Sequence, residues 1–397
     1  MNSFQQHDTI DLPRIGTTEE PENQVFDVAI IGGGLAGLSL SIQLAKQGLK
    51  VILFEKEKYP FHRVCGEYIS LESWNFLENL GYPLSDMDLP IIKNLLVSAP
   101  NGQYIEQSLP LGGFGISRHK IDYELAMLAR ANGVYILEGM KVTEVRFLQT
   151  FIITCSLQQY QAKVVCGAFG KRSNLDIKLK RSFAEQKANR LNNYIGVKYH
   201  IQTNFASDTI ALHNFKNGYC GISRIEEGKY CLCYLTTSNN LRSSQNSIVK
   251  LEEAVLQRNP FLKKIFNESK VLYQTPLTIS QVSFDNKSQV ENHMLMVGDA
   301  GGMITPLCGN GMSMAFHGSK IASELIAQFF SKKITRAELE EQYIKQWNRL
   351  FQKRLQTGRL IQKLFGKEWL TNVFINAVRP YPRFISYLIR QTHGDPF

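Results

Sequence analysis

A glycine-rich turn between an apolar strand and an apolar helix constrains this chain more than any other feature. Residues 27–38 read Asp-Val-Ala-Ile-Ile-Gly-Gly-Gly-Leu-Ala-Gly-Leu, so Gly32, Gly34 and Gly37 stand at the spacing G-x-G-x-x-G. The first glycine permits a tight turn, the second lets the backbone approach a pyrophosphate, and the third lets the helix pack closely on the strand. The N–H groups that open the helix then favour bound phosphate.

An acidic residue follows the second strand of the same unit. The apolar run 51–54 ends at Glu55, 18 residues after Gly37. A carboxylate at that point can accept hydrogen bonds from the ribose hydroxyls of an adenosine. Because strand, glycine turn, helix, second strand and acid follow in register, the sequence predicts a dinucleotide-binding unit rather than a loop.

A second motif lies far along the chain. The apolar run 294–297 ends at Gly298 and Asp299, and Thr-Pro-Leu-Cys-Gly-Asn-Gly-Met follows at 305–312 before an expected helix through residue 325. We expect Asp299 to accept a hydrogen bond from a polyol chain, and the N–H groups at 309–311 to face negative charge. One nucleotide domain must therefore be assembled from distant segments. Runs of β-type residues within 191–235 and 270–285 predict a second, mostly antiparallel sheet.

Composition narrows the class of protein. The chain has 397 residues, 44% hydrophobic and 20% charged, which fits two domains with sizeable cores. No run is apolar enough to span a membrane, and the polar residues 1–24 are expected to be a disordered leader of a cytoplasmic protein. Seven cysteines without paired spacings predict reduced thiols and no metal site. A net charge of +10 comes without a nucleic-acid motif.

Part of the positive charge is concentrated near the C-terminus. Between Lys345 and Arg390 there are ten Lys or Arg and one acid, Glu368, interleaved with apolar and aromatic residues. Two interpretations stay open. The region could bind an anionic membrane surface peripherally or cover an apolar substrate entrance, or it could be a helix packed on the body with a solvated basic face.

Together these motifs resemble the FAD-dependent oxidoreductases of the para-hydroxybenzoate hydroxylase and geranylgeranyl reductase fold. The segment Ser117-Arg118-His-Lys-Ile-Asp122-Tyr-Glu-Leu125 is similar to the family's S-R-x-x-h-D-x-x-L pattern, in which the Arg lies near the flavin diphosphate. Arg118 could also pair with Asp122 across one helical turn. The resemblance implies an α/β fold with a Rossmann-like FAD-binding domain built from discontinuous segments, a second substrate domain and a C-terminal helical region.

The resemblance also implies boundaries and contacts. The FAD-binding domain is expected at 25–80, 110–175 and 286–330, the substrate domain at 81–109 and 176–285, and the helical region at 331–397. The residues expected to hold FAD are Gly32, Gly34, Gly37, Glu55, Arg63, Arg118, Gly298, Asp299, Pro306, Gly309, Asn310, Gly311 and Met312.

The segment Arg63-Val-Cys65-Gly66 is similar to the R-x-C-G segment of geranylgeranyl reductase-like proteins, and it is expected to run past the flavin ring. Arg63 would then contact phosphate or flavin, and Cys65 would lie near the reactive face. Cys65 and His62 are weak catalytic candidates, since a small buried thiol and a structural histidine explain them at least as well. Expected substrate-lining residues on the second sheet are Tyr194, Tyr199, His213, Tyr219 and Tyr234.

The reaction is left between two routes. Aromatic hydroxylases of this fold carry Asp-Gly where this chain has Phe169 and Gly170, which favours a reductase or dehydrogenase acting on a small apolar molecule. The alternative is a monooxygenase that works through a flavin C4a-hydroperoxide. A second G-x-G-x-x-G is missing, so NAD(P)H, if it is the electron donor, would have to bind transiently without a Rossmann domain of its own. Halogenation is disfavoured without a W-x-W-x-I-P segment, and a non-enzymatic flavin-binding protein is the remaining alternative. The oligomeric state is left open.

Overall fold

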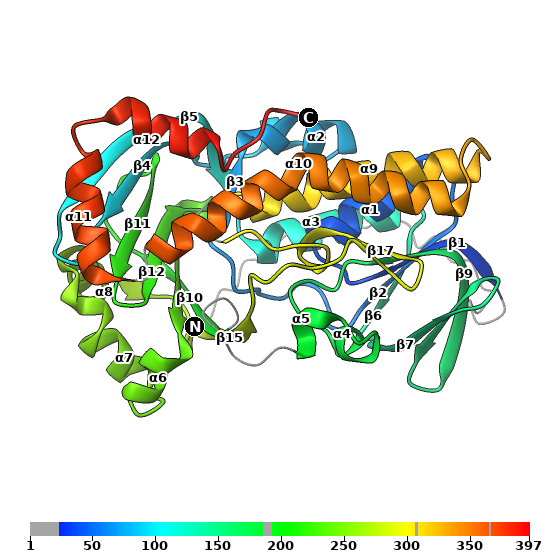
Figure 1. The fold of residues 1–397 in the computed structure, drawn as a ribbon, viewed down its shortest axis with the longest axis horizontal. Helices are drawn as coiled ribbons and strands as arrows, with labels where there is room; N and C mark the ends of the chain where they lie inside the picture. The colour runs from blue at the N-terminus through cyan, green and yellow to red at the C-terminus, as the bar shows by residue number, and fades with distance from the viewer. Residues whose placement is uncertain (1–23, 186–192, 306–308, 365–366) are drawn as a thin grey trace, which may run out of the picture.

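A computed structural model of the chain describes residues 24–185, 193–305, 309–364 and 367–397 (Figure 1). Two β-sheets lie side by side along the long axis, and the C-terminal helices run across both of them. The expected α/β architecture with two sheets and a C-terminal helical region is confirmed. The expected leader falls almost entirely on residues 1–23, which lie outside the described residues.

The first sheet brings together strands that are far apart in the sequence. Its strand order is β16–β17–β9–β1–β2–β6, and the hairpin β7–β8 joins it through β9. The β1 strand is parallel to β2 on one side and to β9 on the other, and β17 extends the sheet beyond β9. The bounds are β1 Val25–Ile31, β2 Val51–Glu55, β6 Tyr135–Glu138, β7 Val142–Phe147, β8 Phe151–Cys155, β9 Gln158–Gly167, β16 Val290–Glu291 and β17 Met294–Met296.

Alternation along β1 explains the two layers on this sheet. Val28 and Ile30 enter a core shared with the long helices, whereas Ala29 and Ile31 enter a separate core on the opposite face. The helices of the first core are α1 Leu35–Lys46, α2 Trp74–Leu80, α3 Arg118–Ala131, α9 Gly311–Phe330 and α10 Arg336–Leu364. The short helices α4 Asn174–Lys178 and α5 Ser182–Glu185 follow β9 in the chain.

The second sheet is mostly antiparallel, as expected. Its order is β14–β10–β13–β12–β11–β4–β5–β3, with β15 beside β10, and only the β11–β4 pair is parallel among the described pairings. Helices α6, α7 and α8 cover one face. The bounds are β3 Tyr68–Ser70, β4 Ile91–Ser98, β5 Tyr104–Gly115, β10 Tyr194–Gln202, β11 Thr209–Phe215, β12 Gly218–Arg224, β13 Tyr230–Thr237, β14 Lys270–Val271, β15 Leu277–Val282, α6 Ser238–Ser243, α7 Ile248–Ala254 and α8 Pro260–Glu268. β3 and the end of β5 pair here, although the sequence division assigned them to the FAD-binding domain.

The basic region between Lys345 and Arg390 divides into two parts. In α10, Trp347 and Phe351 are buried in the core of the first sheet. The following helices, α11 Glu368–Val378 and α12 Pro382–Arg390, instead pack against β4 and β5 of the second sheet. Across the described parts of the chain, no helix combines the length and the apolarity that a membrane crossing requires.

Candidate FAD site

The turn between β1 and α1 requires glycine at two positions. Gly32 has φ +110°, and a Cβ there would lie 2.4 Å from the carbonyl oxygen of Ala168. A Cβ on Gly37 would lie 2.0 Å from the carbonyl oxygen of Gly32. Neither approach is sterically tolerable, so these two glycines set the packing of helix on turn.

Gly34 differs because the space beside it is open. It precedes α1 in an extended conformation, and no side chain caps the helix. A Cβ at Gly34 would meet a single neighbour, Arg118 Nη2, at an ordinary 3.5 Å. The first turn of α1 contains no acid. The helix therefore offers unsatisfied N–H groups and its positive dipole end next to a guanidinium, which is an arrangement that suits a phosphate.

Glu55 is buried at the end of β2 and connects the glycine turn to residues 62–67, which we call the flavin segment. Its Oε2 accepts from the backbone N–H of Gly33 at 2.8 Å and from Arg63 Nη2 at 2.9 Å. Arg63 Nε also donates to Asp122 at 3.0 Å. The predicted ribose acid and the predicted flavin-segment arginine are therefore direct partners.

Arg118 is the first residue of α3, and the alternative of pairing across one helical turn is observed. Its Nε and Nη2 donate to the two carboxylate oxygens of Asp122 at 2.8 and 2.7 Å. The same guanidinium lies beside Gly34, so the Asp122 contact orients it toward the open helix start. Its assignment to the diphosphate stays a prediction.

Asp299 lies in a 3₁₀ turn after β17, next to α1. A Cβ on Gly298, which has φ +63°, would lie 2.9 Å from Ala36 Cβ. The buried ammonium of Lys287 donates to the carbonyl of Asp299 at 2.8 Å, and burial lowers the pKa of this lysine to about 8. Burial also raises the pKa of Asp299, against the opposing charges of Lys287 and Arg118. The Asp299 side chain can accept hydrogen bonds from the hydroxyls of a polyol.

The start of α9 holds the remaining predicted residues. Gly309 has φ +65°, Gly311 is the first residue of the helix, and the side chain of the N-cap residue Asn310 makes no capping hydrogen bond. Asn310 is buried, but its amide donates to the carbonyl of Thr392 at 2.9 Å, which joins the helix start to the C-terminal segment. Met312 Sδ lies 3.5 Å from Cys65 Sγ. Pro306 lies outside the described residues.

The segment that contains Cys65 is bound to the second sheet through its backbone. Burial raises the pKa of Cys65, so its thiol stays protonated at neutral pH. Three side chains of the sheet donate to carbonyls of this segment: Lys198 Nζ to Arg63 at 3.1 Å, Ser223 Oγ to Gly66 at 3.1 Å and Cys231 Sγ to Cys65 at 3.2 Å.

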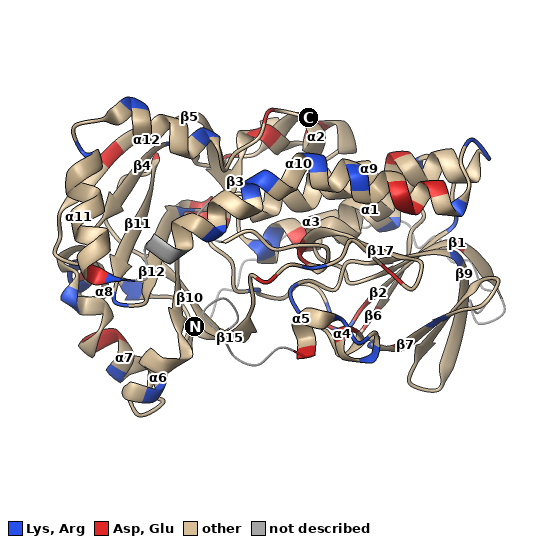
Figure 2. Ribbon diagram, viewed as in Figure 1, with Lys and Arg blue, Asp and Glu red and all other residues tan. Residues whose placement is uncertain are grey.

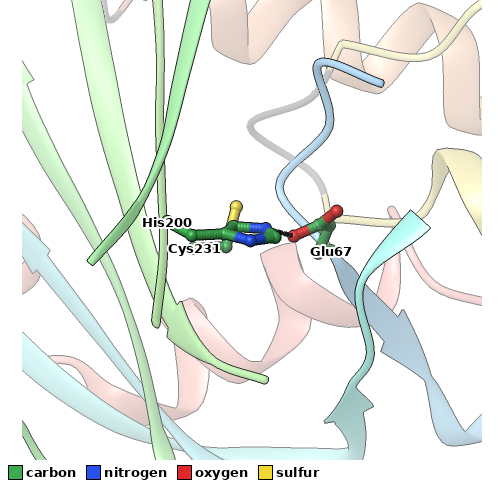
Figure 3. A group of neighbouring side chains, drawn as sticks. All are labelled: Glu67, His200 and Cys231. Carbon is green, nitrogen blue, oxygen red and sulfur yellow. Dashed lines mark hydrogen bonds and ion pairs between the residues drawn. The ribbon is translucent and has the colours of Figure 1, made fainter. Parts of the chain in front are cut away.

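Glu67 ends this segment in a fully buried charge network that the sequence reasoning missed (Figure 3). One carboxylate oxygen accepts from Lys198 Nζ and from the backbone N–H of Arg118 at 2.7 Å, and the other pairs with His200 Nε2 at 2.6 Å. Burial opposes the charged form, but Lys198 and His200 lower the pKa of Glu67 to about 2. The network joins β10, the flavin segment and the start of α3.

Glu67, His200 and Cys231 place three donor atoms within 4.8 Å of one another (Figure 3). The Lys198 ammonium already binds the Glu67 carboxylate, and the Cys231 thiol donates to Cys65. A cation here would have to displace one positive charge and ionise a thiol whose pKa burial raises well above its usual value. The arrangement is therefore better described as an ion-pair network than as a metal site.

His62 lies among aromatic rings between the two sheets. Its ring stacks on His119 with centroids 4.4 Å apart, and its Nδ1 lies 3.1 Å from the hydroxyl of Tyr273. Burial, with added repulsion from His119 and Lys198, lowers the pKa of His62 to about 4. The imidazole is neutral at pH 7, so it could act as a base there but not as a cationic acid.

The two faces of the second sheet separate the expected substrate-lining residues. Tyr199 and Tyr234 point into the core beneath α7, where both hydroxyls donate to Glu252 at 2.8 Å. His213 is also on this face and stacks on Phe261 of α8. These three residues are therefore covered by helices and cannot line a pocket beside the flavin segment, which corrects that expectation. The period of two along β10 places Lys198 and His200 on the other face.

The residues of both helix starts fit FAD. Gly34 leaves room for phosphate beside an uncapped helix, Glu55 stands at the end of β2 for the ribose, and Asp299 lies in the 3₁₀ turn after β17. Arg118 lies where it can neutralise a diphosphate. FAD held there would supply two-electron transfer at its ring.

Comparison with known proteins supports this interpretation. Residues 27–62 match the model of the FAD binding domain family. The conditioned medium factor receptor 1 of Dictyostelium discoideum is 26% identical over 85% of this chain and 68% of that protein. The digeranylgeranylglycerophospholipid reductase of Methanococcus vannielii is 22% identical over 86% and 88%. The kynurenine 3-monooxygenase of Christiangramia forsetii is 24% identical over 75% and 72%.

Solved structures share the fold over nearly the whole chain. A geranylgeranyl bacteriochlorophyll reductase-like protein of Thermoplasma acidophilum has a TM-score of 0.74 at 17% identity and covers 94% of this chain and 97% of its own. The flavin-dependent brominase Bmp2 has a TM-score of 0.75 at 20% identity, with 93% of each chain covered. The protein is thus an FAD-dependent oxidoreductase, and it shares its fold with a geranylgeranyl reductase-like protein.

Proposed function

We propose that the enzyme reduces a carbon–carbon double bond of an apolar, polyprenyl-type substrate. The observation that supports this most is the position of the Arg63-Val-Cys65-Gly66 segment. It lies between Met312 at the start of α9 and the face of the second sheet that carries Lys198 and His200, so that a bound flavin ring and a substrate could meet beside this segment. Relatives named as digeranylgeranylglycerophospholipid reductases match over most of their length.

Saturation of a double bond needs a proton as well as a hydride. The hydride forms one C–H bond, and a protein acid or water must supply the proton for the other carbon. We assign this proton to the Cys65 thiol, because it lies 3.5 Å from Met312 at the predicted flavin site and stays protonated at neutral pH. The electrons come from an external reductant, and we propose NAD(P)H as a donor that binds transiently.

The kynurenine 3-monooxygenase relative gives hydroxylation a second place among the candidate functions. The two reactions differ in their products. A reductase adds two hydrogen atoms to the substrate and works without O₂, whereas a monooxygenase adds one oxygen atom and requires O₂. The brominase likeness, at 20% identity, concerns the fold alone, so halogenation stays disfavoured.

The test uses the FAD-loaded enzyme, a chemical reductant and a digeranylgeranylglycerophospholipid, with and without O₂. Mass spectrometry should find a gain of two hydrogen atoms per double bond under strict anaerobiosis. Products that contain oxygen, and form only with O₂, would move the function to hydroxylation. In Cys65→Ser the anaerobic rate should fall at unchanged flavin content, while Cys233→Ser should behave as wild type.

The flavin site has its own test. Asp299→Ala should purify with little or no FAD, because it removes the proposed polyol partner in the 3₁₀ turn after β17. Asp86, an exposed acid remote from the predicted contacts, gives the matched control Asp86→Ala. Equal FAD absorbance per protein in both variants would refute the assignment of Asp299.

A further inference from the structure

The C-terminal helices leave a group of large apolar side chains in solvent. We call Trp369, Val373, Tyr381, Phe384 and Tyr387 the aromatic face, and these residues are 64, 58, 63, 46 and 56% exposed. They come from α11, from α12 and from the connection between the two helices. An open hollow lined by residues 380–384 lies within this group. Single exposed apolar residues are ordinary, but five within nineteen consecutive residues need an explanation.

The aromatic face points away from the body of the protein. On their inner sides, α11 and α12 bury Ile375, Val378 and Ile385 in one small core with residues of β4 and β5. Because both helices rest on the same patch of the sheet, their opposite sides share an outward direction. Figure 1 shows the two helices at one end of the molecule, far from the strands β7 and β9 at the other end.

The charges around this face are mostly positive, and Glu368, which precedes Trp369, is an adjacent acid. Arg379, Arg383 and Arg390 are exposed on or beside α12, and residues 369–394 contain no Asp or Glu. Figure 2 shows α12 with Lys and Arg colouring and without acidic residues. In α10, by contrast, the aromatic residues Trp347 and Phe351 are buried. Among the described residues of 345–390, the exposed apolar side chains are therefore concentrated in the second half of the pattern.

We propose that the aromatic face binds the surface of an anionic membrane. Trp and Tyr are suited to the headgroup region because each ring has an apolar body and a polar edge, and Phe and Val can enter the acyl boundary. Three arginines add attraction to lipid phosphates, against one adjacent carboxylate, that of Glu368. An apolar protein partner would not need three unpaired arginines around the contact. The inference depends on these exposed residues and not on the proposed reaction, so either can fail alone.

The experiment measures co-sedimentation of the FAD-loaded protein with vesicles of phosphatidylcholine, with and without phosphatidylserine. We expect binding to the mixed vesicles at low salt and release at high salt. Arg379→Gln/Arg383→Gln/Arg390→Gln should reduce the bound fraction about tenfold or more. The charge-matched control Lys141→Gln/Lys332→Gln/Lys333→Gln changes exposed residues of the β6–β7 connection and the turn after α9, and it should bind as wild type.

A second pair of variants tests the apolar contribution. Trp369→Ser/Phe384→Ser/Tyr387→Ser should lose most vesicle binding, whereas Leu148→Ser/Leu157→Ser, at two other exposed apolar positions, should not. Unchanged FAD content shows that each variant is folded. Absence of vesicle binding by the wild type, or equal losses in the variants and their controls, would overturn the proposal. A wild-type dimer that the aromatic variant converts to monomer would also overturn it and assign the face to a second copy.

Discussion

The two sheets contact the flavin segment, residues 62–67, in different ways. On the first sheet, the contact is Glu55 to Arg63, beside a glycine turn whose helix start is uncapped. On the second sheet, Lys198 and His200 enclose Glu67 in a network with no solvent exposure at its carboxylate. The first sheet thus leaves backbone N–H groups free for a ligand, whereas the charged side chains of the second sheet hold the flavin segment in place. Binding and positioning are therefore assigned to opposite sides of the same segment.

Replacement of Glu67 should cause the largest loss of stability. Glu67→Leu leaves the Lys198 ammonium buried without its partner, which costs about 3–5 kcal/mol in comparable sites. Urea unfolding of the apoprotein measures this free energy. Glu106→Leu, on an exposed part of β5, should change it by less than about 0.5 kcal/mol. Equal stabilities for the two variants would show that the network does not hold the segment.

Gly37→Ala should lower the free energy of unfolding by less than Glu67→Leu does, because it disturbs packing alone. The new Cβ would meet the backbone oxygen of Gly32 at 2.0 Å, and overpacking of this kind costs about 1–3 kcal/mol. The loss should be visible in the apoprotein, before any FAD is added. A variant as stable as wild type would mean that the glycine turn can shift, and that its geometry is less fixed than that of the Glu67 network.

The pH dependence of stability should report on a buried histidine of the second sheet. Burial lowers the pKa of His213 to about 3, so the folded state keeps this ring neutral. As the pH falls below 6.5 the unfolded chain takes up a proton that the folded chain refuses, and stability falls by up to about 1.4 kcal/mol per pH unit until about pH 3. Glu67 affects stability at lower pH than His213 does. Its stabilising contribution is complete above about pH 4.5 and is lost as the pH falls toward 2.

The variant His213→Asn tests the contribution of His213 in the upper part of this pH range. Asparagine can keep a hydrogen bond to Ser98, whose hydroxyl lies 2.9 Å from the histidine Nδ1, but it does not titrate. Between pH 6.5 and 5 the variant should lose about 2 kcal/mol less stability than wild type. Urea denaturation at a series of pH values provides the comparison. Parallel curves would show that His213 is not held neutral.

The two sheets also differ in how well the sequence predicted them. The β1–α1–β2 unit was predictable because its partners lie within 30 residues, as Glu55 and Gly33 do. The Glu67 network was not, since Lys198 is 131 residues away and no local pattern pairs them. The bond from Asn310 to Thr392 spans 82 residues and was missed for the same reason. One signal was available, because alternation along 194–201 already separates Lys198 and His200 from Tyr199.

The smallest change in stability should come from Gly34→Ser, and it should have the largest effect on FAD. Gly34 is extended and its Cβ position is open, and serine is a favoured residue before a helix, so the apoprotein should unfold within about 0.5 kcal/mol of wild type. The added side chain, however, occupies the approach of a pyrophosphate, and its hydroxyl competes for the N–H groups that the phosphate needs. Gly221→Ser, in the second sheet with similar space, should keep its FAD. If Gly34→Ser retains full flavin absorbance, the uncapped start of α1 is not where the diphosphate binds, and the contrast between an open first sheet and a closed second one no longer explains cofactor binding.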